Sequence, residues 1–321
     1  MSSDNDKPSP WAQARPRPDR RDGPRPKRGE GVGSDARARM HIEGRDAPSR
    51  PQRSHPSPRS NDAGELGNAT AAPPKAAREQ RLYGLNACLA AFARRPEALR
   101  KVYLTEARMS SLKTVLAWCV KQRIGYRVVD AADLDKLTAS RHHEGVCFDL
   151  LPPSPLSLQA LLDRQPGTPE PSLLLWLDGV GNPHNLGALL RSAAHFGVGG
   201  VIVPSDGGID VSGAAARVAE GAAEIVPLVH APNPHVALRE LRARDYALAA
   251  TVPHGGDSLY ASSLPQRLVL VLGAEGEGMS EAMVADADLH LSIPGSGAIE
   301  SLNVAASVAV ALGEYWRQLH A

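Results

Sequence analysis

The chain has 321 residues, carries 36 lysines and arginines against 35 aspartates and glutamates, and contains only 4% aromatic residues. No stretch approaches the roughly 18 consecutive apolar residues of a membrane-spanning helix, so no membrane partner is expected. The 3 cysteines are widely spaced without a C-x-x-C pair, and no histidine cluster accompanies them. This pattern fits a protein of the reducing cytoplasm and predicts no bound metal.

The first 80 residues differ in composition from the rest. They hold 12 of the 27 prolines, a single aromatic residue, and 16 basic against 11 acidic side chains. Such a segment cannot bury enough apolar surface to offset the entropy of ordering it, so residues 1–80 are expected to form a disordered tail. It lacks the apolar run of a signal peptide and is too acidic for a typical transit peptide. Its arginines could contact RNA phosphates, and the alternative is a solvated extension.

Residues 81–151 are predicted to form a small α/β module of their own. A turn at Tyr83 leads into a first helix, and Asp130 is expected to cap a later short helix. The remaining expected elements are strands over 101–104, 126–129 and 145–150 and helices over 112–123 and 133–138. About 70 residues suffice for a small core. A proline-rich linker, 152–170, is expected to follow it.

Residues 171–321 are predicted to form a second, larger α/β module. It opens with a continuous apolar run over 173–178, which is typical of a strand buried on both faces of a parallel sheet. Further strands are expected over 200–203, 224–228, 246–250, 267–272 and 289–293, alternating with helices over 185–196, 212–220, 234–243 and 302–318. This alternation predicts a mostly parallel, doubly wound sheet with helices on both faces.

Two glycine-containing loops near the end of the chain indicate a cofactor site. The first reads Val-Leu-Gly-Ala-Glu-Gly-Glu-Gly-Met over 271–279, and the second lies between a strand ending near Ile293 and the final helix. A strand that turns on glycine can present backbone groups to a ligand. Neither loop matches the phosphate-binding G-x-x-x-x-G-K-[ST] pattern, and Gly276-x-Gly278 lacks the third glycine of the dinucleotide fingerprint.

Five polar residues at the ends of predicted strands are candidates for the site. Asn185 begins a helix and Arg191 lies six residues later, Glu275 follows a buried strand, and Ser301 and Asn303 precede the final helix. Each has an ordinary alternative. Asn185, Ser301 and Asn303 would serve as helix caps, Arg191 as a surface cation and Glu275 as a loop charge.

Taken together, these segments resemble the three sequence motifs of the SpoU (TrmH) family of the SPOUT superfamily. The matching patterns are Asn-x5-Arg from Asn185, Leu-Gly-x-Glu-Gly-x-Gly-Met from Leu272, and Ile-Pro-x-x-Gly-x3-Ser-Leu-Asn-Val from Ile293. The resemblance covers about 173–319. It implies methyl transfer from S-adenosylmethionine to a ribose 2′-hydroxyl of rRNA or tRNA, and a sheet closed by a trefoil knot.

The smaller module is similar to the family's RNA-binding domain of the L30e-like type. It begins with Tyr83-Gly-x-Asn-Ala and ends with His143-Glu-Gly-Val. The chain most resembles the bacterial subgroup with a long basic tail. The family also implies a homodimer, for which Tyr315 and Trp316 of the final helix are candidate contacts, or alternatively core residues.

The resemblance assigns the candidate residues to two roles. It implies cofactor contacts, largely through the backbone, at Gly273, Glu275, Gly276, Ile293, Pro294, Leu302 and Asn303. It implies catalytic roles for Asn185, Arg191, Glu275, Ser301 and Asn303. Arg191 matches the family's catalytic arginine, but a guanidinium offers no acceptor and has a pKa above about 12. We therefore prefer that it hold a phosphate and stabilise a developing alkoxide.

Two positions depart from the family pattern. Gly295 stands where many relatives have methionine, and Glu144 stands where the smaller domain usually has glutamine. A carboxylate near RNA would add repulsion. The alternatives to the enzyme are a catalytically inactive RNA-binding or ribosome-assembly factor of the same fold, and a base methyltransferase, which the Asn-x5-Arg and Ser-Leu-Asn motifs disfavour.

Overall fold

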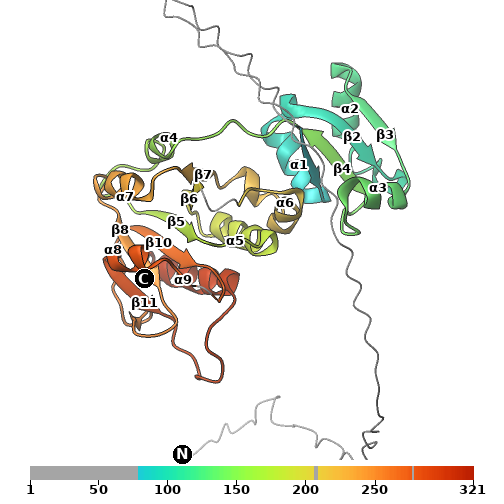
Figure 1. Cartoon of the computed structure of the whole chain (residues 1–321). Coiled ribbons are helices and arrows are strands. Elements are labelled where there is room, and N and C mark those ends of the chain that lie inside the picture. The colour runs from blue at the N-terminus through green and yellow to red at the C-terminus, as the bar shows by residue number, and fades with distance from the viewer. Residues whose placement is uncertain (1–78, 206–208, 277) are drawn as a thin grey trace, which may run out of the picture. The chain divides into compact units, whose positions relative to one another are not determined.

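The structure is a computed structural model that describes residues 79–205, 209–276 and 278–321. The predicted disordered tail therefore lies outside the described residues, apart from its last two positions. Two β-sheets with their helices make up the described chain (Figure 1). We call residues 79–151 the small module and residues 158–321 the large module. None of the helices in the described ranges is long and apolar enough to cross a membrane.

The small module is a four-stranded sheet in the order β1-β4-β2-β3. Its elements are β1 (Gln80–Tyr83), α1 (Leu85–Arg94), η1 (Pro96–Ala98), β2 (Leu99–Leu104), η2 (Glu106–Arg108), α2 (Lys113–Gln122), β3 (Gly125–Val128), α3 (Ala131–Thr138) and β4 (Val146–Leu150). The core lies where α1 and α2 cover one face of the sheet around Phe148. Strand β1 was not expected, because it is four residues long and buries only Leu82 and Tyr83. Asp130 precedes α3 as expected, but its side chain makes no capping hydrogen bond.

The large module is a seven-stranded parallel sheet in the order β7-β6-β5-β10-β8-β11-β9. Its strands are β5 (Ser172–Asp178), β6 (Gly200–Pro204), β7 (Leu228–Ala231), β8 (Ala247–Thr251), β9 (Asp257–Ser258), β10 (Arg267–Gly273) and β11 (Leu289–Ser292). Its helices are α4 (Leu158–Leu162), α5 (Pro183–His195), α6 (Gly213–Ala219), η4 (Ala222–Glu224), α7 (Pro234–Arg242), α8 (Glu281–Asp286) and α9 (Val304–Leu319). The predicted mostly parallel sheet is confirmed.

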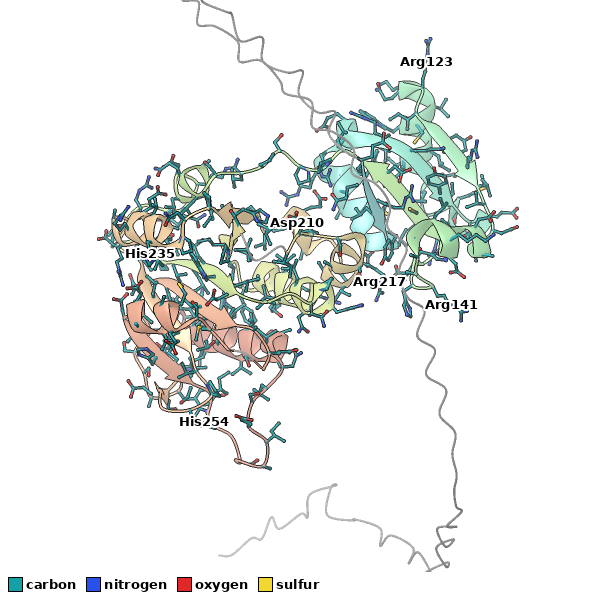
Figure 2. All side chains as sticks on the ribbon, viewed as in Figure 1. Arg123, Arg141, Asp210, Arg217, His235 and His254 are labelled. Atoms are coloured by element: carbon teal, nitrogen blue, oxygen red, sulfur yellow. The ribbon has the colours of Figure 1, made fainter. Side chains whose placement is uncertain are left out.

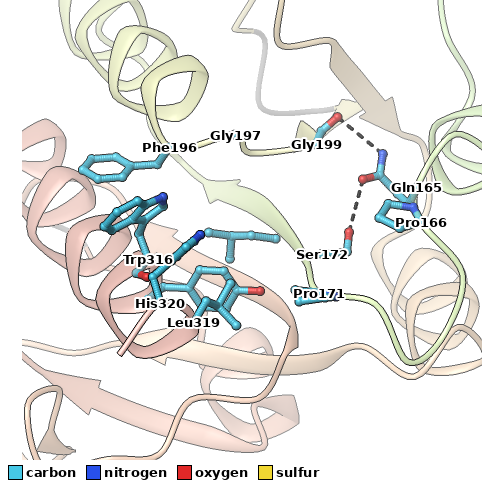
Figure 3. A pocket seen from close by; sticks show the side chains of 12 residues that line it. Gln165, Pro166, Pro171, Ser172, Phe196, Gly197, Gly199, Trp316, Leu319 and His320 are labelled. Carbon is cyan, nitrogen blue, oxygen red and sulfur yellow. Dashed lines mark hydrogen bonds between the residues drawn. The ribbon is translucent and has the colours of Figure 1, made fainter.

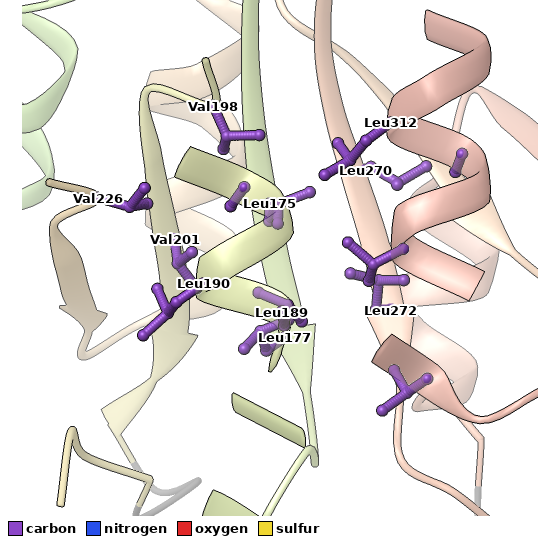
Figure 4. Close-up of a cluster of buried hydrophobic side chains, with 14 of the residues drawn as sticks. Leu175, Leu177, Leu189, Leu190, Val198, Val201, Val226, Leu270, Leu272 and Leu312 are labelled. Carbon is purple, nitrogen blue, oxygen red and sulfur yellow. The ribbon is translucent and has the colours of Figure 1, made fainter. Parts of the chain in front are cut away.

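Alternating side chains of the central strands divide the core of the large module into two layers. Leu175 and Leu270 face α5, α6 and α9, where they join the larger cluster (Figure 4). Trp176 and Val271 face the opposite way, toward α4, α7 and α8. Because both faces are covered, β5 and β10 are apolar along almost their whole length, and their polar groups appear only where the strands end.

One predicted strand is wrong. The residues 224–228 were expected to form a strand, but Ala222–Glu224 is a turn of 3-10 helix and the strand begins at Leu228. The carboxylate of Glu224 is held by Arg95 of the small module, a tertiary contact that the local pattern does not encode. Helix α9 begins at Val304 rather than 302, because Asn303 is its N-cap.

The strand order determines where the loops gather. Strand β10 pairs with β5 on one side and with β8 on the other. As all strands are parallel, the loops that follow β5, β10 and β11 leave the same edge of the sheet. Ligands of open α/β sheets bind at this edge. The trefoil knot implied by the family resemblance stays a prediction.

Candidate functional site

The start of helix α5 leaves Asn185 available for other contacts. Asn182 is the N-cap, and its side chain accepts a hydrogen bond from the backbone N–H of His184 over 2.9 Å. Pro183 then occupies the first helical position, where its missing N–H has no cost. The alternative interpretation of Asn185 as a helix cap is therefore wrong, and its amide projects from the first turn of the helix.

Three of the candidate residues meet through hydrogen bonds. The side-chain nitrogen of Asn303 donates to Oε1 of Glu275 over 2.6 Å and to Oδ1 of Asn185 over 3.2 Å. The same Glu275 oxygen accepts from the backbone N–H of Val304 over 3.1 Å, so the carboxylate also stabilises the positive N-terminal end of α9. One residue from each of the three sequence motifs thus takes part in one network.

Asn303 has two functions in this network. Its side-chain oxygen caps α9 by accepting from the backbone N–H of Ala305 over 3.0 Å. Its nitrogen is thereby directed toward Glu275 and Asn185. The helix-cap interpretation of Asn303 was correct, but it describes only half of what the side chain does.

A pocket of about 180 Å³ lies beside this network. It is lined by Gly179, Val180, Gly181, Asn182, Asn185, Ala274, Glu275 and Val304. Apart from Val304, these residues follow β5 and β10 at their carboxyl ends, where a parallel sheet is expected to bind its ligand. The pocket therefore joins the first two motifs to the start of the final helix.

The loop after β10 is held tightly at its two ends. Ala274 and Gly278 exchange backbone hydrogen bonds of 2.9 and 3.0 Å. A Cβ atom at Gly273 would lie 2.4 Å from the carbonyl carbon of Gly278, so only glycine fits there. Gly276 has a φ of 88°, which also favours glycine.

Asp178 also fixes this loop and was not among the sequence candidates. Its carboxylate accepts from the backbone N–H of Ser280 over 2.7 Å, which joins the end of β5 to the start of α8. The signal that could have identified it is its position: a carboxylate directly after a buried apolar strand and before Gly179. That is the same signal that singled out Glu275 after β10.

The loop between β11 and α9 presents backbone groups rather than packed side chains. Ile293 packs against the larger core cluster, whereas Pro294 and Ser301 are exposed and Leu302 is 43% exposed. Within the described residues, the backbone N–H groups of 295–302 make one hydrogen bond, from Ala298 to the side chain of Ser296. The other N–H groups have no partner among the described residues, which fits a cofactor held through the backbone.

The departure at Gly295 does not remove a packing contact. A Cβ atom there would meet no atom within 4 Å, so the position faces open space among the described residues. There is therefore room for a side chain to begin at this position.

Arg191 and Ser301 are not part of the hydrogen-bonded network. Arg191 is exposed on α5, six residues after Asn185, which places it about 9 Å farther along the helix axis. The two residues are also separated by more than a quarter turn around the helix. The structure therefore brings Asn185, Glu275 and Asn303 together but leaves Arg191 on the outer face of α5.

A second cavity, of about 200 Å³, lies at the opposite end of the sheet (Figure 3). Ser172 at the start of β5 lines it, together with Trp316 and His320 near the end of α9. The rings of Trp316 and His320 stack with their centroids 4.1 Å apart. Because it lies at the amino ends of the strands and away from all three motifs, we do not assign it to the candidate site.

The cysteines are packing residues. Cys88, Cys119 and Cys147 are buried and form no disulfide. Burial raises the pKa of the Cys147 thiol to about 12 and raises that of Cys88 well above its ordinary value. Thiols in this state are protonated at neutral pH and are poor nucleophiles. In the described parts of the chain, no group of three or more His, Cys, Asp and Glu residues has a geometry that could hold a metal ion.

Comparison with known proteins identifies relatives along both modules. Residues 172–313 match the model of the SpoU rRNA methylase family, and residues 81–156 match a model described as RNA 2′-O ribose methyltransferase substrate binding. The chain is 40% identical to the uncharacterised tRNA/rRNA methyltransferase YfiF of Escherichia coli O157:H7 over 242 residues, which cover 75% of this chain and 69% of that protein. It is 35% identical to the 23S rRNA (guanosine-2′-O-)-methyltransferase RlmB of Escherichia coli K12 over 238 residues, covering 74% and 98% of the two chains.

Solved structures agree on the fold. The SpoU methyltransferase AviRb from Streptomyces viridochromogenes, crystallised with S-adenosylmethionine, superimposes with a TM-score of 0.62 at 24% identity and covers 76% of this chain and 92% of its own. An RNA 2′-O ribose methyltransferase superimposes with a TM-score of 0.63 at 25% identity, covering 76% and 90%. With its three motifs, its two modules and these relatives, the chain belongs to the SpoU rRNA methylase family.

Proposed function

We propose that the protein transfers a methyl group from S-adenosylmethionine to a ribose 2′-hydroxyl of rRNA or tRNA. The observation that carries this proposal is the hydrogen-bonded network of Asn185, Glu275 and Asn303 beside a pocket at the carboxyl edge of the sheet. Because RlmB is a 23S rRNA (guanosine-2′-O-)-methyltransferase, a guanosine of 23S rRNA is the first substrate to test.

The residues around the pocket suit S-adenosylmethionine. The loop over 295–302, which leads to Val304 in the pocket wall, and the close turn at Gly273 next to Ala274 offer polar backbone atoms, and Ile293 and Leu302 offer apolar surface beside them. We assign Gly276 and Pro294 to shaping the two loops, and Glu275 to joining them through Asn303. When bound, the cofactor supplies a methyl group on a positively charged sulfur, so the reaction requires alignment of the acceptor oxygen.

Arg191 acts on the RNA in this proposal. Its guanidinium would bind a phosphate next to the target ribose and stabilise the 2′-oxygen as its proton leaves. Asn185 and Ser301 would orient the ribose through their side-chain oxygen and nitrogen or hydroxyl groups. Because a guanidinium has no acceptor, the proton is expected to pass to solvent rather than to Arg191.

The position of Arg191 supports a homodimer as part of the proposal. Arg191 is exposed on α5, and α9, which packs against α5, carries the small residues Ala306 and Gly313 and also Trp316, which is 48% exposed. Small side chains allow a second copy to approach closely, and an exposed tryptophan is a frequent interface residue. In a dimer that pairs through these helices, we expect Arg191 to act on RNA bound at the network of the partner. Analytical ultracentrifugation of wild type and Trp316→Asp tests it, and a monomeric wild type would contradict it.

Methylation is tested with purified full-length protein, S-adenosylmethionine, and rRNA and tRNA from a strain that lacks the gene. Nuclease digestion and mass spectrometry then distinguish methyl groups on ribose from those on bases. New 2′-O-methyl nucleosides are expected. Methyl groups only on bases would favour a base methyltransferase, and the absence of cofactor binding by calorimetry at millimolar ligand would favour an inactive RNA-binding protein.

A further inference from the structure

The segment formed by α6 and η4, residues 213–224, is buried on two sides. Ala215, Ala219 and Ala222 point into the larger core cluster of the large module, beside α5. Ala216 points the opposite way and belongs to the core cluster of the small module. A single short helix therefore contributes side chains to the cores of both modules.

Glycines allow α6 to pack closely both on α5 and on the small module. On the side of α5, a Cβ atom at Gly187 would lie 2.4 Å from the backbone oxygen of Ala215. On the side of the small module, a Cβ atom at Gly213 would lie 2.7 Å from the backbone oxygen of Arg81. Both neighbours are backbone atoms, which cannot move aside like a flexible side chain. The distance between α5 and the small module is thus set by close contacts with backbone atoms of α6 and β1.

A nearly buried ion pair also lies in the interface between the small module and the α6–η4 segment. Nε and Nη2 of Arg95 donate to the two carboxylate oxygens of Glu224 over 2.9 and 2.8 Å, and each of the two side chains is 13% exposed. A third nitrogen of Arg95 donates to the backbone oxygen of Leu151. This two-pronged geometry fixes orientation as well as distance.

Two further polar contacts lie along the same segment. Arg217, labelled in Figure 2, donates to the carboxylate of Glu144 over 3.4 Å, and Asn86 donates to Glu220 over 2.5 Å. Glu144 also accepts from the backbone N–H of Leu85 at the start of α1 over 3.0 Å. The departure at Glu144 thus has a structural partner on the large module, and its charge is not directed at RNA alone.

We propose that Arg95 and Glu224 are positioning residues, which dock the small module on α6 and thereby fix bound RNA relative to Asn185 and Arg191. This inference rests on the proposed function. Helix α6 packs on α5, and α5 carries both of those active-site candidates. A substrate-binding module held at a fixed distance from α5 would deliver the ribose in one orientation, whereas a freely hinged one would not.

The kinetic test compares full-length wild type with the double variant R95A/E224A, which leaves no buried charge without a partner. The expected result is a fall in kcat for RNA methylation of about tenfold or more, because small misplacements of reacting groups are costly. The KM for S-adenosylmethionine should be unchanged. R95K keeps the charge but loses the two-pronged contact, so its kcat should lie between those of wild type and R95A.

The matched control is the ion pair between Arg244 and Asp163, which are 2.6 Å apart and both belong to the large module. R244A/D163A should methylate RNA at the wild-type rate. If R95A/E224A also keeps the wild-type kcat, or if it loses only RNA affinity in parallel with thermal stability, the interface is merely structural and the proposal is overturned.

A second measurement does not depend on methylation. Spin labels at K121C in the small module and R239C in the large module report the distance between them, because both native side chains are exposed and the native cysteines are buried. A narrow distance distribution is expected in the otherwise wild-type protein, and a broad one after adding R95A/E224A. A broad distribution before that change overturns docking. A narrow distance distribution in a protein that methylates no RNA would support docking of the small module and contradict the proposed function instead.

Discussion

Glu275 connects two loops through a single carboxylate oxygen, which accepts from Asn303 and from the backbone of Val304. Glu275→Ala removes this acceptor and both of its hydrogen bonds and leaves the start of α9 without its negative partner, so methylation is expected to fall by about 100-fold or more. Glu275→Gln keeps an oxygen that can accept, and should retain more activity. Steady-state kinetics with RNA checks both, and equal activity of the two variants would contradict this role.

The role proposed for Arg191 can be separated from cofactor binding. Arg191→Ala should abolish methylation while leaving the affinity for S-adenosylmethionine near that of wild type, because the side chain lies outside the pocket and its hydrogen-bonded network. Calorimetry and a methylation assay on the same preparation test this. A parallel loss of both properties would show that Arg191 supports the cofactor loops instead.

The buried thiols give a test of the packing. Burial raises the pKa of the Cys147 thiol to about 12, so at pH 8 almost none of it is the reactive thiolate in the folded state. Folded protein should react slowly with a thiol reagent at pH 8, and denatured protein should release the full signal of 3 cysteines at once. Rapid labelling of the folded chain would mean that the small module opens.

At the scale of elements, two glycines of the cofactor loops are predicted to behave differently. Gly273→Ala would place a methyl group 2.4 Å from backbone, so the loop after β10 must shift and the affinity for S-adenosylmethionine should fall by about tenfold or more. Gly295→Ala is the matched control, because nothing lies within 4 Å of its Cβ position. Calorimetry should show near wild-type affinity for the control and weakened binding only for the first variant.

Elements were predictable from the sequence where a local pattern determines them. The apolar runs that became β5 and β10 mark strands buried on both faces, and the loops after them carry the polar residues of the site. The element at Glu224 was not predictable, because its geometry depends on Arg95, which lies far away in the sequence. Asn185 was open to two interpretations in the sequence, and the structure decides between them because Asn182 caps α5 and Asn185 instead contacts the distant Asn303.

At the scale of the molecule, the tail is predicted to affect RNA binding but not folding. Removing residues 1–78 should leave the thermal unfolding of the remaining chain unchanged, because a segment of this proline-rich, charged composition has too little apolar surface to contribute to a core. RNA affinity should weaken mainly at low salt, because contacts of arginines with phosphates are screened as salt rises. Binding measured across a salt series tests this, and equal curves for both chains would identify the tail as a solvated extension.

The insertion of β10 between β5 and β8 has a consequence for the order of assembly. Ser172 pairs with Arg267, and β8 pairs with the same strand, so the centre of the sheet closes only when a late part of the chain arrives. Until then β5 has an open edge, which can pair with other chains. Long-range pairing of this kind also folds slowly. A newly made chain that stops before residue 267 should therefore aggregate. The ability to bind a ligand is expected only after synthesis has passed the last of the three motifs.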